Sequence, residues 1–351
     1  MRLSDNALRE IAENRVLSLW GALLSRHPDQ LNRPHGADAE LIPLAGTDRI
    51  LATTIDTIAE EIALGFFESP ETIGWMGATV SLSDLAAVGA TPLGLVASVT
   101  LPRGSPPEFQ AGIARGLEAA CRAAGTFVLG GDTNSGDVAV ITSAGIGTVH
   151  RDRVMTRVGC KPGDLVFATG PLGLGGAVSA RALFELPPAL FAESEFRPSA
   201  RFREATVIAR FASACIDTSD ALIAALDQLG RLNGVGFDVD ASLDVVVAPR
   251  ALAVAKALNV DPLVLLAQHH GEFELVFTVP TTRIAAFDSA TATAGFAPLR
   301  IGVVTAETPV LRFLADRPRT LDGARIRNLL DAVGGDVRAY LAALIELMRS
   351  A

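Results

Sequence analysis

Lysine is almost missing from this chain of 351 residues, which contains only Lys161 and Lys256. Neither lysine lies in a GxxxxGKS/T loop or in a strand of the VAIK type. In those two settings a lysine binds the phosphates of a nucleotide. Any phosphoryl chemistry in this chain must therefore rely on groups other than a P-loop lysine or a protein-kinase lysine.

Cysteine is scarce as well, and Cys121, Cys160 and Cys215 form a set of odd number. The sequence has no CxxC pair and no cysteine and histidine spacing typical of zinc ligands. Neither a disulfide framework nor a zinc site is therefore indicated. We expect three buried thiols.

Long apolar runs and basic patches are also missing. No apolar run reaches the roughly 18 residues that cross a bilayer, and acidic residues interrupt the apolar positions of residues 1–20, unlike in a secretory signal. The net charge of −9, without a cluster of lysine and arginine, disfavours a nucleic-acid surface. Because 49% of the residues are hydrophobic, a large core is possible. We expect a cytoplasmic protein whose partners are small molecules, not nucleic acids or membranes.

Alternating strand and helix patterns predict an α/β fold. After a helical pattern at 4–25, the first half is predicted to contain strands at 49–56, 93–101, 126–130 and 137–149 and helices at 69–90 and 107–124. The second half is predicted to contain strands near 164–169, 234–239, 272–279 and 298–304 and helices at 174–184, 219–231 and 249–257. The length and a KPGD turn before Asp164 predict a helical extension (1–33), two α/β domains (34–155 and 156–320) and a helical tail (321–351).

Aspartates stand at the ends of predicted apolar elements, and they are Asp38, Asp56, Asp84, Asp132, Asp217 and Asp220. Carboxylates gathered at the rims of buried elements repel one another and bind protons unless a cation lies among them. A ligand set made of oxygens suits Mg²⁺, which also bridges substrate phosphates. Each aspartate taken alone is a common helix or turn cap, so separate caps remain an alternative.

Two further segments have polar groups where a phosphate or metal could bind. GGDTNSG (130–136) follows an apolar run that resembles a buried strand, and its residues suit either a tight turn or a ligand site. Ser219 lies between Asp217 and Asp220 where a strand gives way to a helix, and such a start offers either an anion site or an ordinary N-cap. The glycine-rich turn at 170–176 is a weaker candidate for a phosphate cradle.

Four segments follow one another in a recognisable order, namely SLSDLAAVGATP (81–92), LGGDTNSG (129–136), TRVGCKPGDLVFATG (156–170) and CIDTSDAL (215–222). Together they resemble the thiamine-monophosphate kinase family, within the wider family of aminoimidazole ribonucleotide synthetase. The resemblance extends from about residue 34 to residue 305. It implies a two-domain synthetase-like fold with mixed sheets and flanking helices, in which the N-terminal sheet is completed across a homodimer.

The resemblance also implies an activity, in which ATP and Mg²⁺ serve to transfer the γ-phosphoryl group to a small phosphorylated acceptor, either thiamine phosphate or an altered molecule. The metal ligands that it implies are Asp38, Thr54, Asp56, Asp84, Asp132, Asp217 and Asp220. The implied nucleotide-binding residues are Gly130, Gly131, Asp132, Thr133, Arg157 and Ser219. The residues expected to matter most for the reaction are Asp56, Asp132, Arg157 and Asp220.

This chain departs from the family pattern mainly on the acceptor side. The family's GGEDYEL is HHGEFEL here (269–275), and the other replacements of family residues are Ala37 for an aspartate, Ala63 for a histidine, Met76 for a lysine and Ala221 for a glycine. Because most metal and ATP positions survive, we expect the phosphoryl-transfer site to be kept and the acceptor site to be changed. The candidate acceptor residues are His269, His270 and Glu272.

Two other functions remain open. The first is an ATP-dependent ligase or synthetase of the same superfamily. Those relatives that need a reactive cysteine near one end of the chain fit poorly, because the three cysteines here lie at 121, 160 and 215. The second is a regulatory protein that binds ATP without catalysis, which the replacements at Ala37 and Ala63 would suit.

Overall fold

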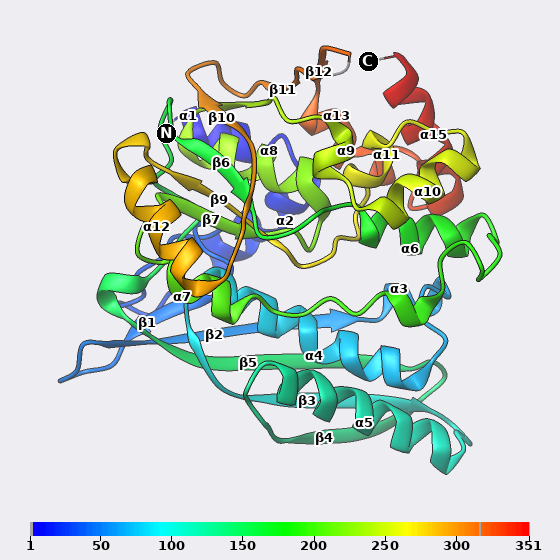
Figure 1. Cartoon of the computed structure of the whole chain (residues 1–351). Coiled ribbons are helices and arrows are strands. Elements are labelled where there is room, and N and C mark those ends of the chain that lie inside the picture. Colours follow the sequence, from blue (N-terminus) through cyan, green and yellow to red (C-terminus); the bar gives the residue numbers. More distant parts are fainter. Residues whose placement is uncertain (1–2, 316, 351) are drawn as a thin grey trace.

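A computed structural model of the chain describes residues 3–315 and 317–350, and the side chains from residue 6 onward. Two mixed sheets form separate layers, one from the first half of the chain and one from the second (Figure 1). Helix α4 (Pro70–Ala87) lies between them, against strands of the first sheet and one strand of the second. The predicted fold class is confirmed.

The first sheet has the strand order β1-β2-β5-β3-β4, with β3 and β4 parallel and the other pairs antiparallel. Its strands are β1 (Glu40–Pro43), β2 (Arg49–Ile58), β3 (Thr91–Pro102), β4 (Val128–Gly136) and β5 (Val140–His150). Helices α4 and α5 (Pro107–Ala123) cover one face of this sheet (Figure 1). The alternating exposure of β5 is that of a strand with one face against these helices.

Helix α4 begins where the sequence predicts, because Ser69 accepts a hydrogen bond from the Thr72 amide at 3.4 Å and Pro70 occupies the first turn. It then packs so closely on α5 that two glycines are required. A Cβ atom on Gly74 would lie 2.0 Å from a backbone oxygen of α5, and one on Gly116 would lie 2.1 Å from the carbonyl oxygen of Glu71. The two helix backbones are therefore in direct contact.

The second sheet has the strand order β12-β11-β8-β10-β6-β9-β7, with only the pair β11 and β8 parallel in the described chain. Its strands are β6 (Leu165–Ala168), β7 (Ala214–Asp217), β8 (Gly236–Val239), β9 (Leu275–Val279), β10 (Leu299–Thr305), β11 (Leu311–Phe313) and β12 (Arg319–Leu321). Its longer helices are α6 (Leu174–Leu183), α8 (Ala221–Asn233), α10 (Pro249–Leu258), α12 (Ile284–Ala294) and α15 (Val337–Ser350).

The remaining described helices are short or lie at the N-terminal end. They are α1 (Leu3–Leu8), α2 (Ala12–Leu23), α3 (Glu60–Ala63), α7 (Phe202–Ile208), α9 (Leu243–Val246), α11 (Leu263–Leu266), α13 (Gly323–Arg327) and α14 (Leu329–Ala332), with 3-10 turns at Arg151–Arg153, Glu193–Glu195 and Thr281–Arg283. Among the described helices, none combines the length and the apolar character that crossing a membrane requires.

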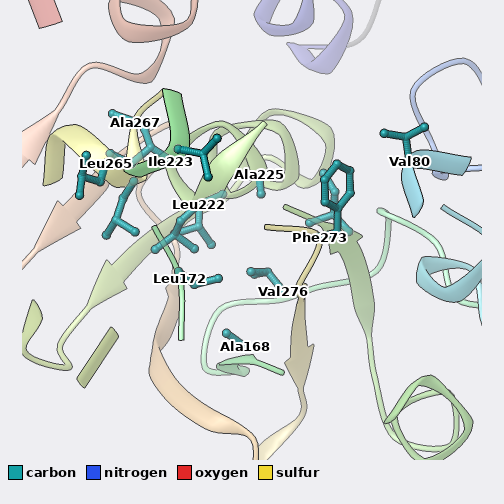
Figure 2. Packing of buried hydrophobic residues seen from close by; sticks show 14 of the residues in the cluster. Val80, Ala168, Leu172, Leu222, Ile223, Ala225, Leu265, Ala267, Phe273 and Val276 are labelled. Carbon is teal, nitrogen blue, oxygen red and sulfur yellow. The ribbon is translucent and has the colours of Figure 1, made fainter. Parts of the chain in front are cut away.

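One apolar core joins the two halves. It includes Val80 of α4 and Leu222, Ile223, Phe273 and Val276 of the second half (Figure 2). Burial of such side chains removes about 25 cal/mol of unfavourable hydration per Å² of apolar surface. The contact between the halves is therefore part of the core, which fixes the residues of α4 relative to β7.

Most predicted elements are confirmed, including β2, α4, α5 and α8, and all three cysteines are buried thiols as expected. The predicted domain boundary between residues 155 and 156 falls in the segment between β5 and β6. Residues 1–2 and 351, at the ends of the predicted extension and tail, lie outside the described residues.

The prediction of a buried strand at 126–130 that ends before GGDTNSG is wrong. Strand β4 runs through that motif to Gly136, and every residue from Val128 to Ser135 is exposed. The reason is topological, because β4 is the edge strand of its sheet and pairs with β3 alone. Its apolar residues look like those of a buried strand, although α5 does not bury them.

Candidate functional site

Three of the predicted aspartates converge where the two halves meet. Asp38 lies just before β1, Asp84 lies on α4, and Asp217 ends β7. One carboxylate oxygen from each lies within 4.8 Å of the others. We call these residues the acidic trio. Since they come from distant parts of the chain, their meeting is a property of the fold and not of a local turn.

Hydroxyl groups hold two members of the acidic trio in place. Thr54 Oγ1 donates to Asp84 Oδ2 at 2.5 Å, and Ser83 Oγ donates to Asp217 Oδ2 at 2.6 Å. Ser219 Oγ donates to Asp217 Oδ1 at 2.9 Å. The predicted Thr54 and Ser219 therefore lie at the site. Ser83 was not among the predicted site residues, and its signal was a small polar residue directly before Asp84 in α4.

The predicted arginine also reaches the acidic trio. Arg157 Nη2 lies 3.0 Å from Asp38 Oδ1, and the Asp38 side chain is fully buried. Burial lowers the pKa of the Arg157 guanidinium, but the charge and hydrogen bond of Asp38 raise it more, so its pKa lies above the usual value. Arg157 Nε and Asp38 Oδ2 are buried without a hydrogen-bond partner in the described structure. Both atoms therefore lack the partner that a buried polar group normally has.

The charges of the acidic trio are only partly compensated. Burial, followed by the charges of Asp217 and Asp38, raises the pKa of Asp84 well above its ordinary value. Burial and the charge of Asp38 raise the pKa of Asp217 to about 7, although the hydroxyls of Ser83 and Ser219 oppose this shift. Three close carboxylates with an unpartnered oxygen fit a hard divalent cation such as Mg²⁺.

Asp56 and Asp220 lie beside the acidic trio without belonging to it. Burial raises the pKa of Asp56 to about 6, although the Thr57 amide donates to its Oδ1 at 2.7 Å, and the charge of Asp220 adds to the rise. Asp220 is exposed at the start of α8, and its side chain makes no capping hydrogen bond. Asp220 is therefore not engaged as an ordinary helix cap.

Within one chain, Asp132 lies apart from the acidic trio. Across the first sheet, Asp56 pairs with Ser143, Ser143 with Ala97, and Ala97 with Gly131. Three strand spacings separate the ends of this row, about 14 Å. Ser143 and Ala97 are buried under the helices, so Asp132, one residue beyond Gly131, faces the opposite, open side of the sheet.

The other predicted residues of the motif share the position of Asp132 on the exposed edge strand. Gly130 and Thr133 are exposed, and Asn134 Nδ2 donates to Asp132 Oδ2 at 2.9 Å. Gly131 has a φ of 157°, and a Cβ atom there would lie 1.8 Å from the Ala97 carbonyl oxygen. This glycine permits the close pairing of β3 and β4. The structure does not bring these residues to the acidic trio of the same chain.

Of the candidate acceptor residues, Glu272 is buried and already engaged. Its carboxylate accepts hydrogen bonds from the Gly173 amide at 2.7 Å and from Thr218 Oγ1 at 3.1 Å. Burial and the charge of Glu274 raise its pKa to about 7. A carboxylate of the chain thus occupies the amides of the glycine-rich turn at 170–176. His269 and His270 are partly exposed and line a cavity near Asp220.

A central cavity adjoins the acidic trio. Arg157, Asp217, Ser219, Asp220 and Arg327 are among the residues that line it. Ser219 also lines a second cavity, and Asp220 a third. The start of α8 is therefore the point at which three cavities meet. Free amides at a helix start favour anions, so this junction suits phosphate groups.

Comparisons with known proteins agree with this geometry. Residues 36–149 match a family model described as AIR synthase related protein, N-terminal domain. The thiamine-monophosphate kinase of Pyrococcus horikoshii is 31% identical over 253 residues, which span 71% of this chain and 78% of that protein. The enzyme of the same name from Halobacterium salinarum is 32% identical over 274 residues, or 78% of this chain and 87% of that protein.

Solved structures show the same fold. The crystal structure of tt0281 from Thermus thermophilus has a TM-score of 0.76 and 28% identity, and the match covers 88% of this chain and 98% of that chain. A structure described as AaThiL complexed with AMPPCP and TMP has a TM-score of 0.72 and 22% identity, over 90% and 96% of the two chains.

The family match shows that residues 36–149 form an N-terminal domain of the AIR synthase related class. Within that class the identity to two curated relatives is decisive, because it exceeds 30% over most of their length. The chain belongs to the thiamine-monophosphate kinase family. The resemblance read from the four sequence segments is thus confirmed.

Proposed function

We propose that this chain is an Mg²⁺-dependent kinase that transfers the γ-phosphoryl group of ATP to the phosphate of thiamine phosphate. The observation that carries the proposal is the acidic trio, whose carboxylate oxygens lie within 4.8 Å of one another beside the buried pair of Arg157 and Asp38. The relatives named thiamine-monophosphate kinase, and the AaThiL complex with AMPPCP and TMP, support the choice of donor and acceptor.

The acidic trio would hold Mg²⁺ through its carboxylate oxygens, together with Asp56 and Asp220 beside it. When bound, Mg²⁺ neutralises facing phosphates and holds them in line. Arg157 would bind a phosphate through its unpartnered Nε and offset the charge that develops during transfer. Thr54 fixes the orientation of Asp84, and Ser219 fixes that of Asp217.

The reaction needs no strong base from the protein. A phosphate oxygen of the acceptor, already ionised at neutral pH, forms the new bond to the γ-phosphorus, and the bond to the oxygen between the β- and γ-phosphorus atoms breaks to release ADP. Positioning and charge compensation are therefore the main tasks of the site. A chain with almost no lysine can perform them with carboxylates, one arginine and metal ions.

Calorimetry and turnover together test this function. We expect ATP to bind in the presence of Mg²⁺, and ADP to be released when thiamine phosphate is added. ADP release with another phosphorylated metabolite, and none with thiamine phosphate, would show that the protein is a kinase with a different acceptor. ATP binding without turnover of any acceptor would favour the regulatory alternative, which Ala37 and the engaged carboxylate of Glu272 motivate.

We also propose a homodimer in which the first sheets of two chains meet. Large apolar side chains are exposed on the open face and edge of this sheet: Ile55 is 70% exposed, Phe127 69% and Leu129 56%. Exposed apolar strand edges favour pairing with another chain. Asp132 lies on the same exposed strand, and we propose that it completes the site of the second copy in such a dimer.

A complementation experiment tests this arrangement. Asp132→Ala and Asp84→Asn are each expected to be inactive as homodimers. If one site uses Asp132 of one chain and Asp84 of the other, mixed dimers contain one intact site, and an equimolar mixture should recover about a quarter of wild-type activity. If each site instead used Asp132 and Asp84 of the same chain, mixed dimers would contain no intact site. Absence of recovered activity in a mixture shown to exchange subunits would contradict the shared site.

A further inference from the structure

Glu61 and His270 meet between the two halves of the chain, close to the proposed site. Glu61 lies on α3, and His270 lies between α11 and β9. His270 Nδ1 is 3.6 Å from Glu61 Oε1, which is longer than a hydrogen bond. The His270 ring packs edge-on against Phe66, with 4.6 Å between ring centroids. The carboxylate of Glu61 therefore has only a loose partner.

One side of this pair is an aromatic cavity. Its walls include Phe66, Phe67, Phe196 and Phe273, and both Glu61 and His270 also line it. Ser219 lies at another edge of the same cavity. Ser219 also donates to Asp217 at 2.9 Å, so this one side chain links the edge of the cavity to the acidic trio. A ring held here could place an attached phosphate beside the proposed metal ions.

The other side of the pair is an acidic cavity. It contains five carboxylate side chains and one arginine, namely Glu13, Glu60, Glu61, Asp220, Asp331 and Arg327. His269 lines it too, and burial followed by the charge of His270 lowers its pKa to about 4. Its Nε2 atom is buried with no partner among the described residues. This neutral imidazole adds a hydrogen-bonding group without offsetting the negative charge.

We propose that Glu61, which His270 partners loosely in the unliganded chain, recognises the acceptor and selects one with a cationic heteroaromatic ring. The ring would enter the aromatic cavity beside Phe66, with its positive charge toward Glu61 in place of the His270 imidazole. This inference rests on the proposed kinase function, since the acceptor phosphate must reach the trio past Ser219.

Two physical properties point to this ligand class. Aromatic faces attract both flat rings and cations, and the attraction is stronger where water is excluded. A carboxylate at the border of such walls, with 24% of its side chain exposed and no close partner, gains most from a cation. A neutral ring would satisfy the walls but leave Glu61 uncompensated, and an anionic ring would be repelled by both cavities.

The test compares thiamine phosphate, which has a cationic thiazolium ring, with its neutral thiophene analogue. Wild-type protein is expected to bind thiamine phosphate about 10–100-fold more tightly, on the order expected for one desolvated charge pair. In Glu61→Gln this preference should fall below about threefold, with ATP affinity unchanged. Glu68→Gln, at an exposed position outside both cavities, is the matched control and should keep the wild-type preference.

His270→Ala separates the two parts of the inference. If the ring takes the place of the imidazole, this variant should bind thiamine phosphate at least as tightly as the wild type, and roughly tenfold weaker binding would overturn that displacement. A cation preference that survives in Glu61→Gln would overturn the role of Glu61, as would wild-type protein that binds neither compound.

Binding is measured by calorimetry, so the inference does not depend on turnover. Wild-type protein that binds thiamine phosphate with the expected preference but releases no ADP would refute the proposed function while supporting the recognition site. ADP release from thiamine phosphate and from its neutral analogue with equal KM would support the proposed function and refute the recognition site. Unchanged ATP binding in each variant shows that the fold is intact.

Discussion

Asp84→Asn is expected to lower kcat on the order of 10²–10³-fold while making the metal-free protein more stable. Activity falls because the acidic trio loses one of its three charges for Mg²⁺. Stability rises because burial and the charges of Asp217 and Asp38 raise the pKa of Asp84, so its ionised form is disfavoured in the folded chain at neutral pH. Asparagine can still accept the hydrogen bond from Thr54.

Thermal unfolding in EDTA and with Mg²⁺ and ATP measures both effects. In EDTA the variant should unfold a few degrees above the wild type, since each 1 kcal/mol shifts the melting temperature of a chain this large by about 2–4 °C or less. The stabilisation by Mg²⁺ and ATP seen for the wild type should largely disappear. Asp137→Asn, at an exposed bend, should change neither quantity. A variant less stable than the wild type in EDTA would contradict the repulsion that we infer.

Arg157→Met is expected to destabilise the metal-free protein by about 3 kcal/mol. Removing one partner of a buried ion pair typically costs about 3–5 kcal/mol, because the other charge stays buried and unpaired. Asp38 is fully buried, whereas the Arg157 side chain is 21% exposed, so we expect the lower end of that range. Unfolding in urea with EDTA present gives the free energy directly.

The double variant with Asp38→Asn provides the control for this prediction. Asparagine removes the orphaned charge, so the double variant should recover much of the lost stability, and the cycle gives the coupling between the two residues. If Arg157→Met and the double variant were equally unstable, the loss would come from packing of the arginine chain and not from its charge.

The sequence grouped six aspartates as one candidate metal site and left separate caps as an alternative, and the structure brings Asp38, Asp84 and Asp217 of that group together. Asp217 ends β7 and Asp84 lies in the last turn of α4, where such ends gather at the rim of a layered α/β fold, whereas Asp38 lies in the loop before β1. The family resemblance added Arg157 and Ser219, which lie at the same place. Local pattern and family motif therefore agree wherever a residue is fixed by the end of its own strand or helix.

Asp132 shows what the sequence could not provide. Its place relative to Asp56 depends on strand order and register, and one residue of shift along β4 reverses the face on which a side chain lies. No pattern within GGDTNSG contains that information. The exposure of β4 was missed for a related reason, since an apolar edge strand and an apolar central strand have similar sequences.

The sequence also could not predict which side chains form hydrogen bonds or ion pairs with one another. Glu272 lies in a motif aligned with acceptor residues, yet its carboxylate binds the Gly173 amide inside the second half. No sequence pattern marks Glu61 as a site residue, because its partner His270 lies 209 positions away and meets it only after the halves pack together. Such pairs follow from tertiary packing, which periodicity does not encode.

The glycine contacts between α4 and α5 limit how this enzyme can move. Because Gly74 has no Cβ and the backbones of α4 and α5 touch there, a shift of one helix along the other would press side chains against opposing backbone. Asp84 therefore belongs to a rigid layer formed by α4, α5 and the first sheet. Because the apolar core also joins this layer to the second half, Asp217 keeps its position relative to Asp84, and these two carboxylates are in place before a nucleotide binds.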